Sequence, residues 1–428
     1  MIETKNGRLA IDGCDAEDLA REYGTPLMII SQEHMEKRVK QLRGSFLDKY
    51  ENVRAAYAGK AFLPLAMCRF IEEQGLCLDV VSGGELYTAI CARFPPEKIE
   101  FNGNNKSREE LEMAIGCGVG RIIVDGTDEP ELIQQICREK NKRTNVLMRI
   151  TPGVDSHTHR FITTGSLDSK FGIPMDQVEE VFKKIQGYPH LELLGFHFHV
   201  GSQLHDNTAY LLALEVLLKT IENLEEKYGF QTKEINVGGG FGICYTREDQ
   251  AKPYGYFLDP IMERIEEEYR KKGKTRPAVV AEPGRSIVGE AGMTLYTVGS
   301  TKEIPGVRRY VSVDGGMTDN IRPALYDAKY EAWSSSGKAE EKITVCGKCC
   351  ESGDILLRDV MMNRPERGDL LAIFSTGAYC WSMSSNYNKI PGPPVIMTKE
   401  GNSRLVVKRQ SYQDLIREEV LCKSGESR

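Results

Sequence analysis

The sequence predicts an α/β protein in which a (β/α)8 barrel is joined to a second, all-β domain. Two observations predict this fold. Short apolar runs alternate with helix-like stretches up to about residue 285, and after it the runs become short and β-rich, separated by Gly, Pro and Asn turns. Alternating strands and helices are typical of parallel α/β folds, and eight strands are the number at which a small barrel closes. The alternative, a doubly wound open sheet, usually has fewer strands.

The predicted barrel strands are short apolar runs, most of them flanked by polar or glycine-containing segments. They lie at 53–58, 77–81, 99–102, 121–125, 146–151, 192–200, 234–238 and 278–282. Helices are expected between them, at 63–74, 84–93, 107–115, 176–186, 208–228 and 259–271, with one more at about 33–50. Ser107 and Asp176 are residue types that cap helix N-termini. The barrel is therefore expected over residues 31–285.

The β-domain is expected to combine residues 1–30 with residues 286–428 as a sandwich or barrel-like structure. Its C-terminal part contains the runs MTLYTVGS, RRYVSVDGG, KITVCG, DLLAIF, PVIMT and RLVVKR. Near the N-terminus, RLAIDG and PLMIIS are also strand-like and are able to complete the same domain.

Composition excludes several classes of protein. The formal net charge is −6 and the pI about 5.8, which does not favour a nucleic-acid partner. No apolar stretch approaches the roughly 18 residues of a membrane span, and the first residues lack the layout of a signal peptide, so a cytoplasmic protein with no membrane partner is expected.

The chain has 12 cysteines, most of them single residues among apolar neighbours. We interpret Cys68, Cys77, Cys91, Cys117 and Cys137 as buried small hydrophobes. The exception is the Cys346-x-x-Cys349 pair, which lacks both a second such pair and a nearby histidine, so no metal site is expected.

Two of the expected strands end in side chains suited to binding a cofactor. Active groups of such barrels lie at the C-terminal ends of strands. The first strand ends at Lys60, which desolvation would make a nucleophile toward an aldehyde, although taken alone it is more often a solvated strand-end lysine. The sixth carries His197 and His199 on one face, where an imidazole is suited to stacking on an aromatic ring or to packing in a core. The second ends at Asp79 before what reads as an ordinary βα loop.

The seventh and eighth strands end in groups suited to anions. Val237-Gly-Gly-Gly-Phe-Gly242 exposes consecutive backbone N–H groups, which form a nest for phosphate. Glu282-Pro283-Gly284-Arg285 places a carboxylate and a guanidinium on one short turn, which is either a salt-bridged loop or a site for a ring nitrogen and an anion. Together the four strand ends supply the groups that pyridoxal phosphate needs.

At these residues the chain resembles the alanine-racemase-like group of pyridoxal-phosphate enzymes, and within it the diaminopimelate decarboxylases. The matching segments run in order along nearly the whole chain: AYAGKA, DVVSGGEL, HTHRFITTGSLDSKFG, GFHFHVGS, INVGGGFG, AEPGRSIV, DGGMTDNIRPALY, GKCCESGD and STGAYCWSMSSNYN. Ornithine, arginine and carboxynorspermidine decarboxylases share many of these blocks.

The resemblance implies a role for each matching residue. Lys60 is implied to be the Schiff-base lysine, His199 to stack on the cofactor ring, and Cys350 to donate a proton after decarboxylation. The remaining implied cofactor contacts are Ser202, Gly239, Gly240, Glu282, Pro283, Gly284, Arg285 and Tyr379. The implied substrate contacts are Arg285, Arg322, Tyr326, Glu351, Ser352 and Tyr379. Cys350 and Glu351 are implied to enter the partner subunit's site, which would make the protein an obligate homodimer.

The implied reaction is decarboxylation of meso-2,6-diaminopimelate to L-lysine, the last step of bacterial lysine biosynthesis. Diaminopimelate carries an amine and a carboxylate at each end, so its distal site needs cations and an anion. Arg285 and Arg322, with Glu351, supply them. Two segments depart from the family pattern, Lys389–Pro394 and the Cys-Trp-Ser after GAY. Three alternative functions remain. The first is decarboxylation of D-lysine, D-ornithine, L-ornithine or L-arginine. The second is racemisation, and the third is a non-catalytic regulatory role with bound pyridoxal phosphate.

Overall fold

The structure is a computed structural model that describes residues 2–5, 7–154 and 169–421. The chain divides into two compact units. One is His34–Glu290, and the other combines Met1–Glu33 with Ala291–Arg428. These boundaries fall a few residues beyond those expected from the sequence.

The first unit is a closed barrel of parallel strands. The strands are β5 (Val53–Ala58), β6 (Cys77–Val80), β7 (Ile99–Phe101), β8 (Arg121–Val124), β9 (Thr144–Thr151), β11 (Leu191–His197), β12 (Glu234–Asn236) and β13 (Ala278–Ala281). Pairing of β13 with β5 and of β8 with β9 closes the sheet, and the two-residue strand β10 (Ile173–Pro174) pairs with β9 at its side. The predicted barrel is confirmed, with a strand at each of the eight predicted positions.

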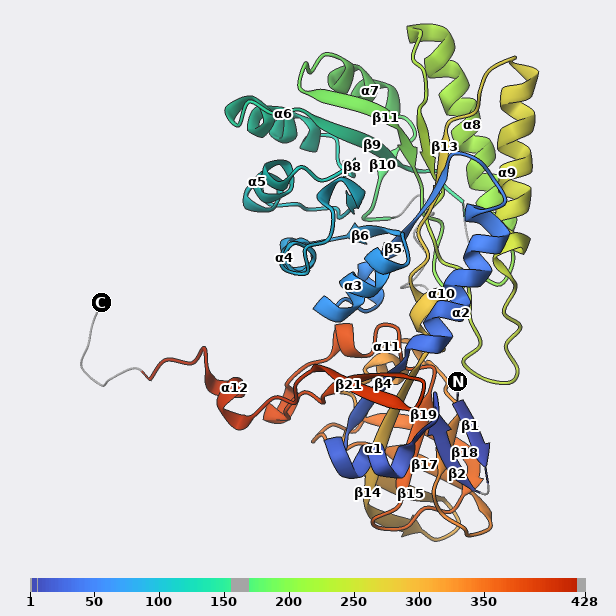
Figure 1. Cartoon of the computed structure of the whole chain (residues 1–428), viewed down its shortest axis with the longest axis vertical. Helices are drawn as coiled ribbons and strands as arrows, with labels where there is room; N and C mark the ends of the chain where they lie inside the picture. Colours follow the sequence, from blue (N-terminus) through green and yellow to red (C-terminus); the bar gives the residue numbers. More distant parts are fainter. Residues whose placement is uncertain (1, 6, 155–168, 422–428) are drawn as a thin grey trace. The chain divides into compact units, whose positions relative to one another are not determined.

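Helices cover the outside of the barrel. They are α2 (Gln32–Leu42), α3 (Leu65–Glu73), α4 (Gly83–Cys91), α5 (Arg108–Cys117), α6 (Glu129–Glu139), α7 (Val178–Gln186), α8 (Thr208–Tyr228) and α9 (Tyr254–Lys271). The short α10 (Arg285–Val288) follows β13 at the C-terminal end of the strands. Figure 1 shows α3 to α6 following one another around the strands. Each strand faces the barrel interior on one side and the surrounding helices on the other. Both faces are therefore buried, which explains why the strands are almost continuously apolar.

Serine side chains cap the starts of two of the barrel helices, Ser82 at α4 and Ser107 at α5. Ser107 caps α5 in a capping box, with the Glu110 N–H donating to its hydroxyl at 3.2 Å and the Glu110 carboxylate accepting from its N–H at 2.8 Å. The prediction that Asp176 caps the helix expected at 176–186 is wrong. Helix α7 begins at Val178 after Gln177, which makes no side-chain cap.

Helix α9 begins five residues before the predicted start at Asp259 and carries Pro260 inside it. A proline has no N–H to donate to the carbonyl four residues earlier, here that of Tyr256. The side-chain amide of Asn207 donates to this carbonyl instead, at 3.2 Å. This substitute hydrogen bond satisfies the freed acceptor and explains why the helix extends beyond the proline on both sides.

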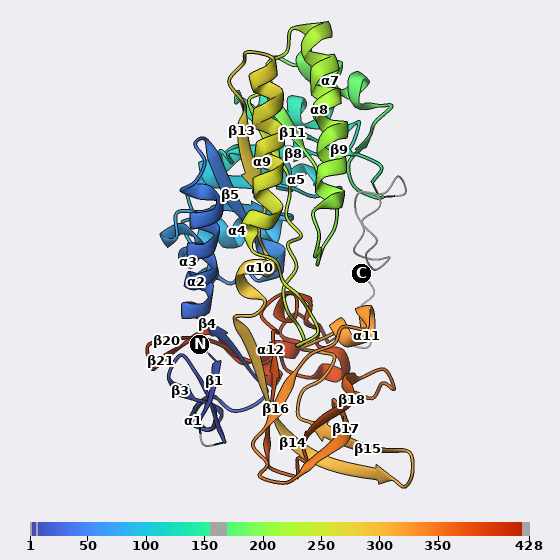
Figure 2. The same ribbon diagram turned by 90° about the vertical axis from the view of Figure 1, so that its right-hand side faces the viewer.

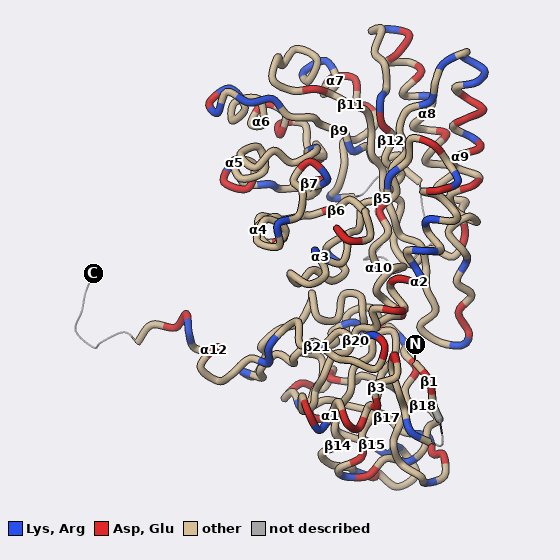
Figure 3. The backbone as a smooth tube through the Cα atoms, in the orientation of Figure 1, with Lys and Arg blue, Asp and Glu red and all other residues tan. Residues whose placement is uncertain are grey.

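The longest helices, α8 and α9, lie side by side on the outside of the barrel (Figure 2). Acidic and basic residues are interspersed along both helices (Figure 3). Arg264 on α9 holds Glu215 on α8 with an Nε–Oε1 distance of 2.5 Å, and Lys272 lies 3.4 Å from Glu222. No helix in the described part of the chain is long and apolar enough to cross a membrane.

The cysteine prediction is only partly correct. Cys68, Cys77 and Cys137 are buried, but Cys91 is exposed and Cys117 is half-buried. Each of these last two is the final residue of its helix, α4 or α5, before the loop that leads to the next strand.

The second unit is built mainly from a nine-stranded, mostly antiparallel sheet. Its strands are β4 (Leu27–Ser31), β14 (Gly292–Ile304), β15 (Arg308–Val313), β16 (Ala332–Ser334), β17 (Glu340–Cys346), β18 (Ile355–Asn363), β19 (Leu370–Phe374), β20 (Val395–Lys399) and β21 (Asn402–Val407). The N-terminal strand β4 lies between β14 and β20, so the first residues of the chain complete a sheet made from its last third.

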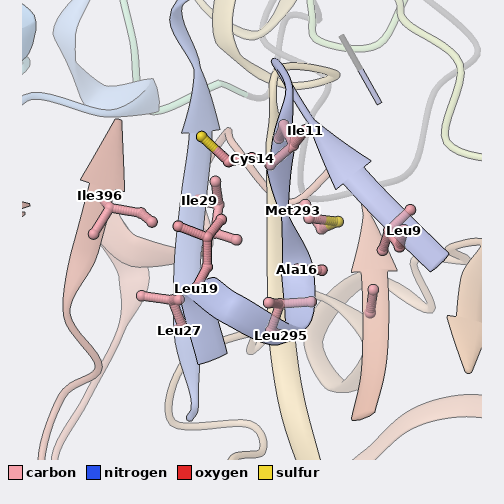
Figure 4. Packing of buried hydrophobic residues seen from close by; sticks show 11 residues of the cluster. Leu9, Ile11, Cys14, Ala16, Leu19, Leu27, Ile29, Met293, Leu295 and Ile396 are labelled. Atoms are coloured by element: carbon pink, nitrogen blue, oxygen red, sulfur yellow. The ribbon is translucent and has the colours of Figure 1, made fainter. Parts of the chain in front are cut away.

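A core of its own stabilises this second unit (Figure 4). Helix α1 (Ala16–Tyr23) and the small sheet of β1 (Ile2–Lys5), β2 (Arg8–Ile11) and β3 (Cys14–Asp15) pack over β4 and β14. Buried side chains that include Leu19, Ile29 and Leu295 fill the space between them. Burying a side chain of this size stabilises the fold by about 1.5–3 kcal/mol.

Candidate active site

Lys60 lies directly after the first barrel strand, in a 3-10 turn over Gly59–Ala61. The turn packs tightly, because a Cβ on Gly59 would come within 3.0 Å of the Asp79 carbonyl oxygen at the end of β6. The Lys60 side chain is exposed, so the expected desolvation of this lysine is not present in the single chain. Burial and the charge of Glu282 raise the pKa of the Asp79 carboxyl, and the Lys60 ammonium partly offsets them. The two residues therefore share one electrostatic environment.

Glu282 follows β13 and is the best-connected carboxylate at this end of the barrel. His197 Nε2 lies 3.1 and 3.2 Å from its two oxygens, and the side-chain amides of Asn236 and Asn102 donate to it at 2.9 and 3.3 Å. Burial opposes its ionisation, but the charge and hydrogen bond of His197 outweigh burial and lower the pKa of Glu282. A buried, ionised carboxylate held in this way suits a ring nitrogen that carries a proton.

His199 lies just beyond the end of β11 and is half-buried. Desolvation, together with the positive charge of Lys60, holds the pKa of His199 well below its usual range. Its Nδ1 accepts a hydrogen bond from the Gly239 N–H at 3.3 Å. The imidazole is therefore neutral at pH 7 and tied to the glycine loop, while His197 is paired with the carboxylate.

The glycine loop after β12 is packed against its surroundings so closely that side chains are excluded. A Cβ on Gly239 would lie 1.9 Å from the Glu282 carbonyl oxygen, and one on Gly240 would lie 2.1 Å from that of Gly201. Gly240 has φ +108°, which strains any residue other than glycine. The N–H groups of Gly238 and Gly239 donate to Asn236 and His199, whereas in the described residues the Gly240 N–H has no protein acceptor. The nest therefore offers fewer N–H groups to an anion than its sequence indicates.

Arg285 is the first residue of α10 and is buried. Its guanidinium donates to the Ser202 hydroxyl at 2.9 Å and to the Tyr245 hydroxyl, and it lies over the Tyr245 ring at 5.6 Å. The tight turn before it depends on Gly284, where a Cβ would meet the Ala58 Cβ at 2.9 Å. The structure thus brings together Ser202 and Arg285, two of the residues singled out in the sequence.

A buried polar network beneath Glu282 was not found by sequence reasoning. Asn102 donates to Asp79 at 2.7 Å, and Asn236 donates to Glu100 at 2.9 Å as well as to Glu282. The usable signal is the presence of polar residues inside otherwise apolar strands, as in IEFN and EINVG. Asp79 belongs to this network, because it lies inside β6 and is buried. Such networks are costly unless each group is satisfied, and they fix the geometry of what they hold. The segment that follows Asp79 is a short βα loop that leads into α4, as expected.

In the second unit, Arg322 begins the short helix α11 (Arg322–Tyr326) and is buried. It donates to the Tyr330 hydroxyl at 2.5 Å, and its guanidinium lies over the Tyr326 and Tyr330 rings at 6.0 and 5.7 Å. Tyr330 was not singled out in the sequence. Tyr379 has φ +66°, a conformation that costs non-glycine residues about 1–3 kcal/mol and collects at functional sites.

The CESGD loop of the second unit presents Cys350, Glu351 and Ser352 to solvent. The buried Asp354 holds the loop, because its carboxylate accepts from the N–H groups of Met317 and Cys349 at 2.7 and 2.8 Å. The Cys350 N–H donates to the Asn388 side chain at 2.7 Å. The loop backbone is therefore held by hydrogen bonds, while these three residues are exposed in the single chain.

Comparisons with known proteins agree with this site. The family model described as pyridoxal-dependent decarboxylase, pyridoxal binding domain, matches residues 32–289. A diaminopimelate decarboxylase of Bacillus subtilis is 47% identical over 99% of this chain and 98% of that protein. Solved structures of diaminopimelate decarboxylases in complex with L-lysine, from M. jannaschii and Helicobacter pylori, are 35% and 30% identical with TM-scores of 0.93 and 0.88. They cover 99% and 94% of this chain and 98% of each of those chains.

This fold and site define the class of pyridoxal-phosphate-dependent enzymes built on a (β/α)8 barrel with an added β-domain. The residues present fit that cofactor, since they supply an ionised buried carboxylate, a neutral imidazole and a backbone N–H without a protein acceptor. The chain belongs to the diaminopimelate decarboxylase family and is a pyridoxal-phosphate-dependent carboxy-lyase. Most of the HTHRFITTGSLDSKFG segment lies outside the described residues.

Proposed function

We propose that this protein decarboxylates meso-2,6-diaminopimelate to L-lysine and carbon dioxide, in the cytoplasm and as a homodimer. The observation that carries the cofactor half of the proposal is the pairing of buried Glu282 with His197 at the same barrel end as Lys60. The substrate half rests on similarity over the whole chain to proteins named for this activity.

Residues of the barrel unit would hold the cofactor. Lys60 would attach it through its aldehyde, Glu282 would hold the proton on its ring nitrogen, and His199 would lie against its ring. The Gly240 N–H would bind its phosphate, together with the neighbouring Gly239, Ser202 and the Pro283–Gly284 turn. When bound, the cofactor supplies an electron sink for the electrons of the broken carbon–carboxylate bond.

Charged side chains would position the substrate. Arg285 and Arg322 are both buried and are suited to carboxylates, which they bind in a fork geometry. Each has a tyrosine ring beside it, Tyr245 for Arg285 and Tyr326 for Arg322. Tyr379 and Ser352 would add hydroxyl contacts.

A second copy of the chain would complete the site. Cys350 and Glu351 are held on a fixed backbone and exposed, which suits residues offered to another subunit. In this arrangement Cys350 of the partner subunit donates the proton that replaces the lost carboxylate, and Glu351 of the partner subunit binds the distal ammonium.

The test of the reaction is carbon dioxide and L-lysine release from meso-diaminopimelate, with D-lysine, D-ornithine, L-ornithine and L-arginine as parallel substrates. We expect turnover of diaminopimelate alone. Turnover of a substrate without a distal carboxylate would retain the cofactor chemistry and contradict the roles of Arg285 and Arg322.

The shared site is tested by mixing two inactive variants, Lys60→Ala and Cys350→Ala. If each site takes residues from both chains, a mixed dimer has one intact site, and random mixing restores about one quarter of the wild-type activity. A mixture as inactive as its components, although mixed dimers have formed, would contradict the shared site.

A further inference from the structure

Asn236 is a fully buried amide in the interior of the barrel. It is the last residue of β12, and because side chains alternate along a strand it lies on the same face as Glu234. Its side-chain nitrogen donates to Glu282 and to Glu100, each at 2.9 Å, and its oxygen accepts from the Gly238 N–H at 2.9 Å. An asparagine amide has two donor hydrogens and one acceptor oxygen, so both hydrogens and the oxygen are used here.

The partners of this amide fix its orientation. A backbone N–H only donates, so the amide oxygen faces Gly238, and the nitrogen with its two hydrogens lies between the two carboxyl groups. An ionised aspartate has no hydrogen to donate, serine has only one, and leucine has none. Asparagine is therefore the side chain of this size that satisfies all three contacts at once.

The two segments that Asn236 joins are those expected to bind opposite ends of the cofactor. Glu282 would hold the ring nitrogen, and Gly238 begins the loop in which the Gly240 N–H would bind the phosphate. The same two segments are joined through their backbones, because the Glu282 N–H donates to the Gly238 carbonyl at 2.7 Å. Asn236 thus fixes the side chain of Glu282 relative to a loop that already holds its backbone.

The glycine loop has a second anchor, Tyr210, which acts on the loop alone. Tyr210 lies on α8 and is buried, and its hydroxyl donates to the Gly239 carbonyl at 2.8 Å. Its ring stacks on Phe241 with a centroid distance of 5.9 Å. Removing the Tyr210 hydroxyl would loosen only the loop, whereas removing the Asn236 amide would loosen the loop and the Glu282 carboxylate together.

We propose that Asn236 is a positioning residue for the cofactor, whose amide holds the Glu282 carboxylate and the glycine loop in one fixed arrangement. The cofactor can then be bound at its ring nitrogen and its phosphate at the same time. This inference rests on the proposed roles of Glu282 and Gly240. It gives Asn236 no contact with the substrate, so loss of the amide should weaken cofactor binding and lower kcat, with little direct effect on KM.

Asn236→Asp keeps the shape of the side chain and replaces its donor by a carboxyl group beside Glu100 and Glu282. The charged groups on the surrounding strands are Asp79 on β6, Arg121 on β8, Arg149 on β9, His197 on β11, Glu234 on β12, and Arg54 and Lys60 on and after β5. His197 and Arg121 already pair with Glu282 and Glu100. Burial and the two neighbouring carboxylates should therefore raise the pKa of the new carboxyl. It gains a proton as the pH falls and can then donate to Glu282 again.

The test is the cofactor affinity and kcat of full-length variants at pH 6 and pH 9, each divided by the wild-type value at the same pH. Affinity is measured by absorbance as cofactor-depleted protein is titrated with pyridoxal phosphate. At pH 9, Asn236→Asp should be impaired at least about tenfold in both quantities, and at pH 6 this deficit should shrink at least about threefold. Asn236→Ser adds no charge, so it should be impaired by a similar factor at both pH values. It also carries the affinity test if Asn236→Asp does not fold.

Two further variants locate the effect. Tyr210→Phe should weaken cofactor affinity about fivefold and equally at both pH values, because it acts on the loop alone. Asn145→Asp is the matched control. It is the same substitution in β9, where the amide donates to the Gly120 carbonyl at 3.0 Å, and it should change affinity less than about twofold.

Two results would overturn the proposal. One is that Asn236→Ser binds the cofactor as tightly as Asn145→Asp does. The other is that the deficit of Asn236→Asp does not shrink at pH 6. The affinity titration requires no substrate, so a wild-type protein that fails to decarboxylate diaminopimelate would refute the proposed reaction and leave the role of Asn236 to be judged by cofactor binding.

Discussion

Replacing Glu282 by glutamine tests whether this carboxylate holds the ring-nitrogen proton of the cofactor. The change keeps the shape of the side chain and removes its negative charge. In the native protein the carboxylate accepts from Asn236 and Asn102 and is paired with His197. An amide at this position cannot stabilise a protonated ring nitrogen by charge.

The magnitude follows from the interaction that is lost. A hydrogen bond to a charged group contributes about 1.5–3 kcal/mol. If that amount is lost from the transition state, kcat falls by about 10- to 150-fold, since each 1.36 kcal/mol corresponds to a factor of ten. The substitution leaves the Gly240 N–H, the proposed phosphate contact, in place, so affinity for the cofactor should fall less than kcat.

The assay is carbon dioxide release at saturating cofactor and substrate, with cofactor affinity measured separately by absorbance. Glu225→Gln is the matched control. Glu225 is also a buried barrel carboxylate, but it pairs with Lys274 at 2.8 Å on the outside of the barrel, so kcat should change less than about twofold. A Glu282→Gln enzyme whose kcat is within about threefold of wild type would refute the reasoning.

Three further predictions concern the glycine loop, the base of the barrel and the β-domain. Gly239→Ala places a Cβ 1.9 Å from a backbone oxygen and should lower cofactor affinity at least tenfold by absorbance titration, at a cost of about 1–3 kcal/mol or more; unchanged affinity would contradict the packing. Glu234→Gln leaves the buried Arg121 and the half-buried Arg54 short of charge and should lower the free energy of unfolding in urea by about 3–5 kcal/mol, whereas Glu180→Gln, in an exposed ion pair, should cost under about 1 kcal/mol. Equal losses in the free energy of unfolding for these two variants would contradict this prediction. Burial raises the pKa of Asp319 to about 6, so the folded state binds this proton more tightly than the unfolded state, and the stability from this carboxyl is lost as the pH rises through 6. The free energy of unfolding of wild type relative to Asp319→Asn should therefore fall by up to about 3 kcal/mol between pH 4 and pH 7, and a difference that rises would be the wrong sign.

Much of the barrel could be predicted because its determinants are local. Parallel strands buried on both faces are short apolar runs, and the helices between them have their own periodicity and caps, as Ser107 shows. The errors arose where a distant residue intervened. The start of α9 was misplaced because the amide of Asn207, far from Pro260 in sequence, supplies the hydrogen bond that the proline removes.

The site residues divide in the same way. Lys60, His199, Ser202, the glycine loop and Glu282–Arg285 could be predicted as candidate site residues from the sequence, because each lies at the end of a recognisable strand and strand ends of a barrel converge. Asn102, Asn236 and Tyr245 were not found, because a polar residue in an apolar run does not reveal what it contacts.

By itself, the amino-acid sequence determined the order of strands and helices, the change to a β-rich region and the residue types at the strand ends. Only the tertiary structure decided that Glu282 is paired with His197, that the N–H groups of Gly238 and Gly239 are already used, and that Arg121 at the opposite end of the barrel is paired with Glu100 and Glu234. The physical reason is that hydrogen-bond partners and burial are set by residues distant along the chain. Short-range patterns fix a strand, but the ionisation and pairing of its side chains depend on every strand beside it.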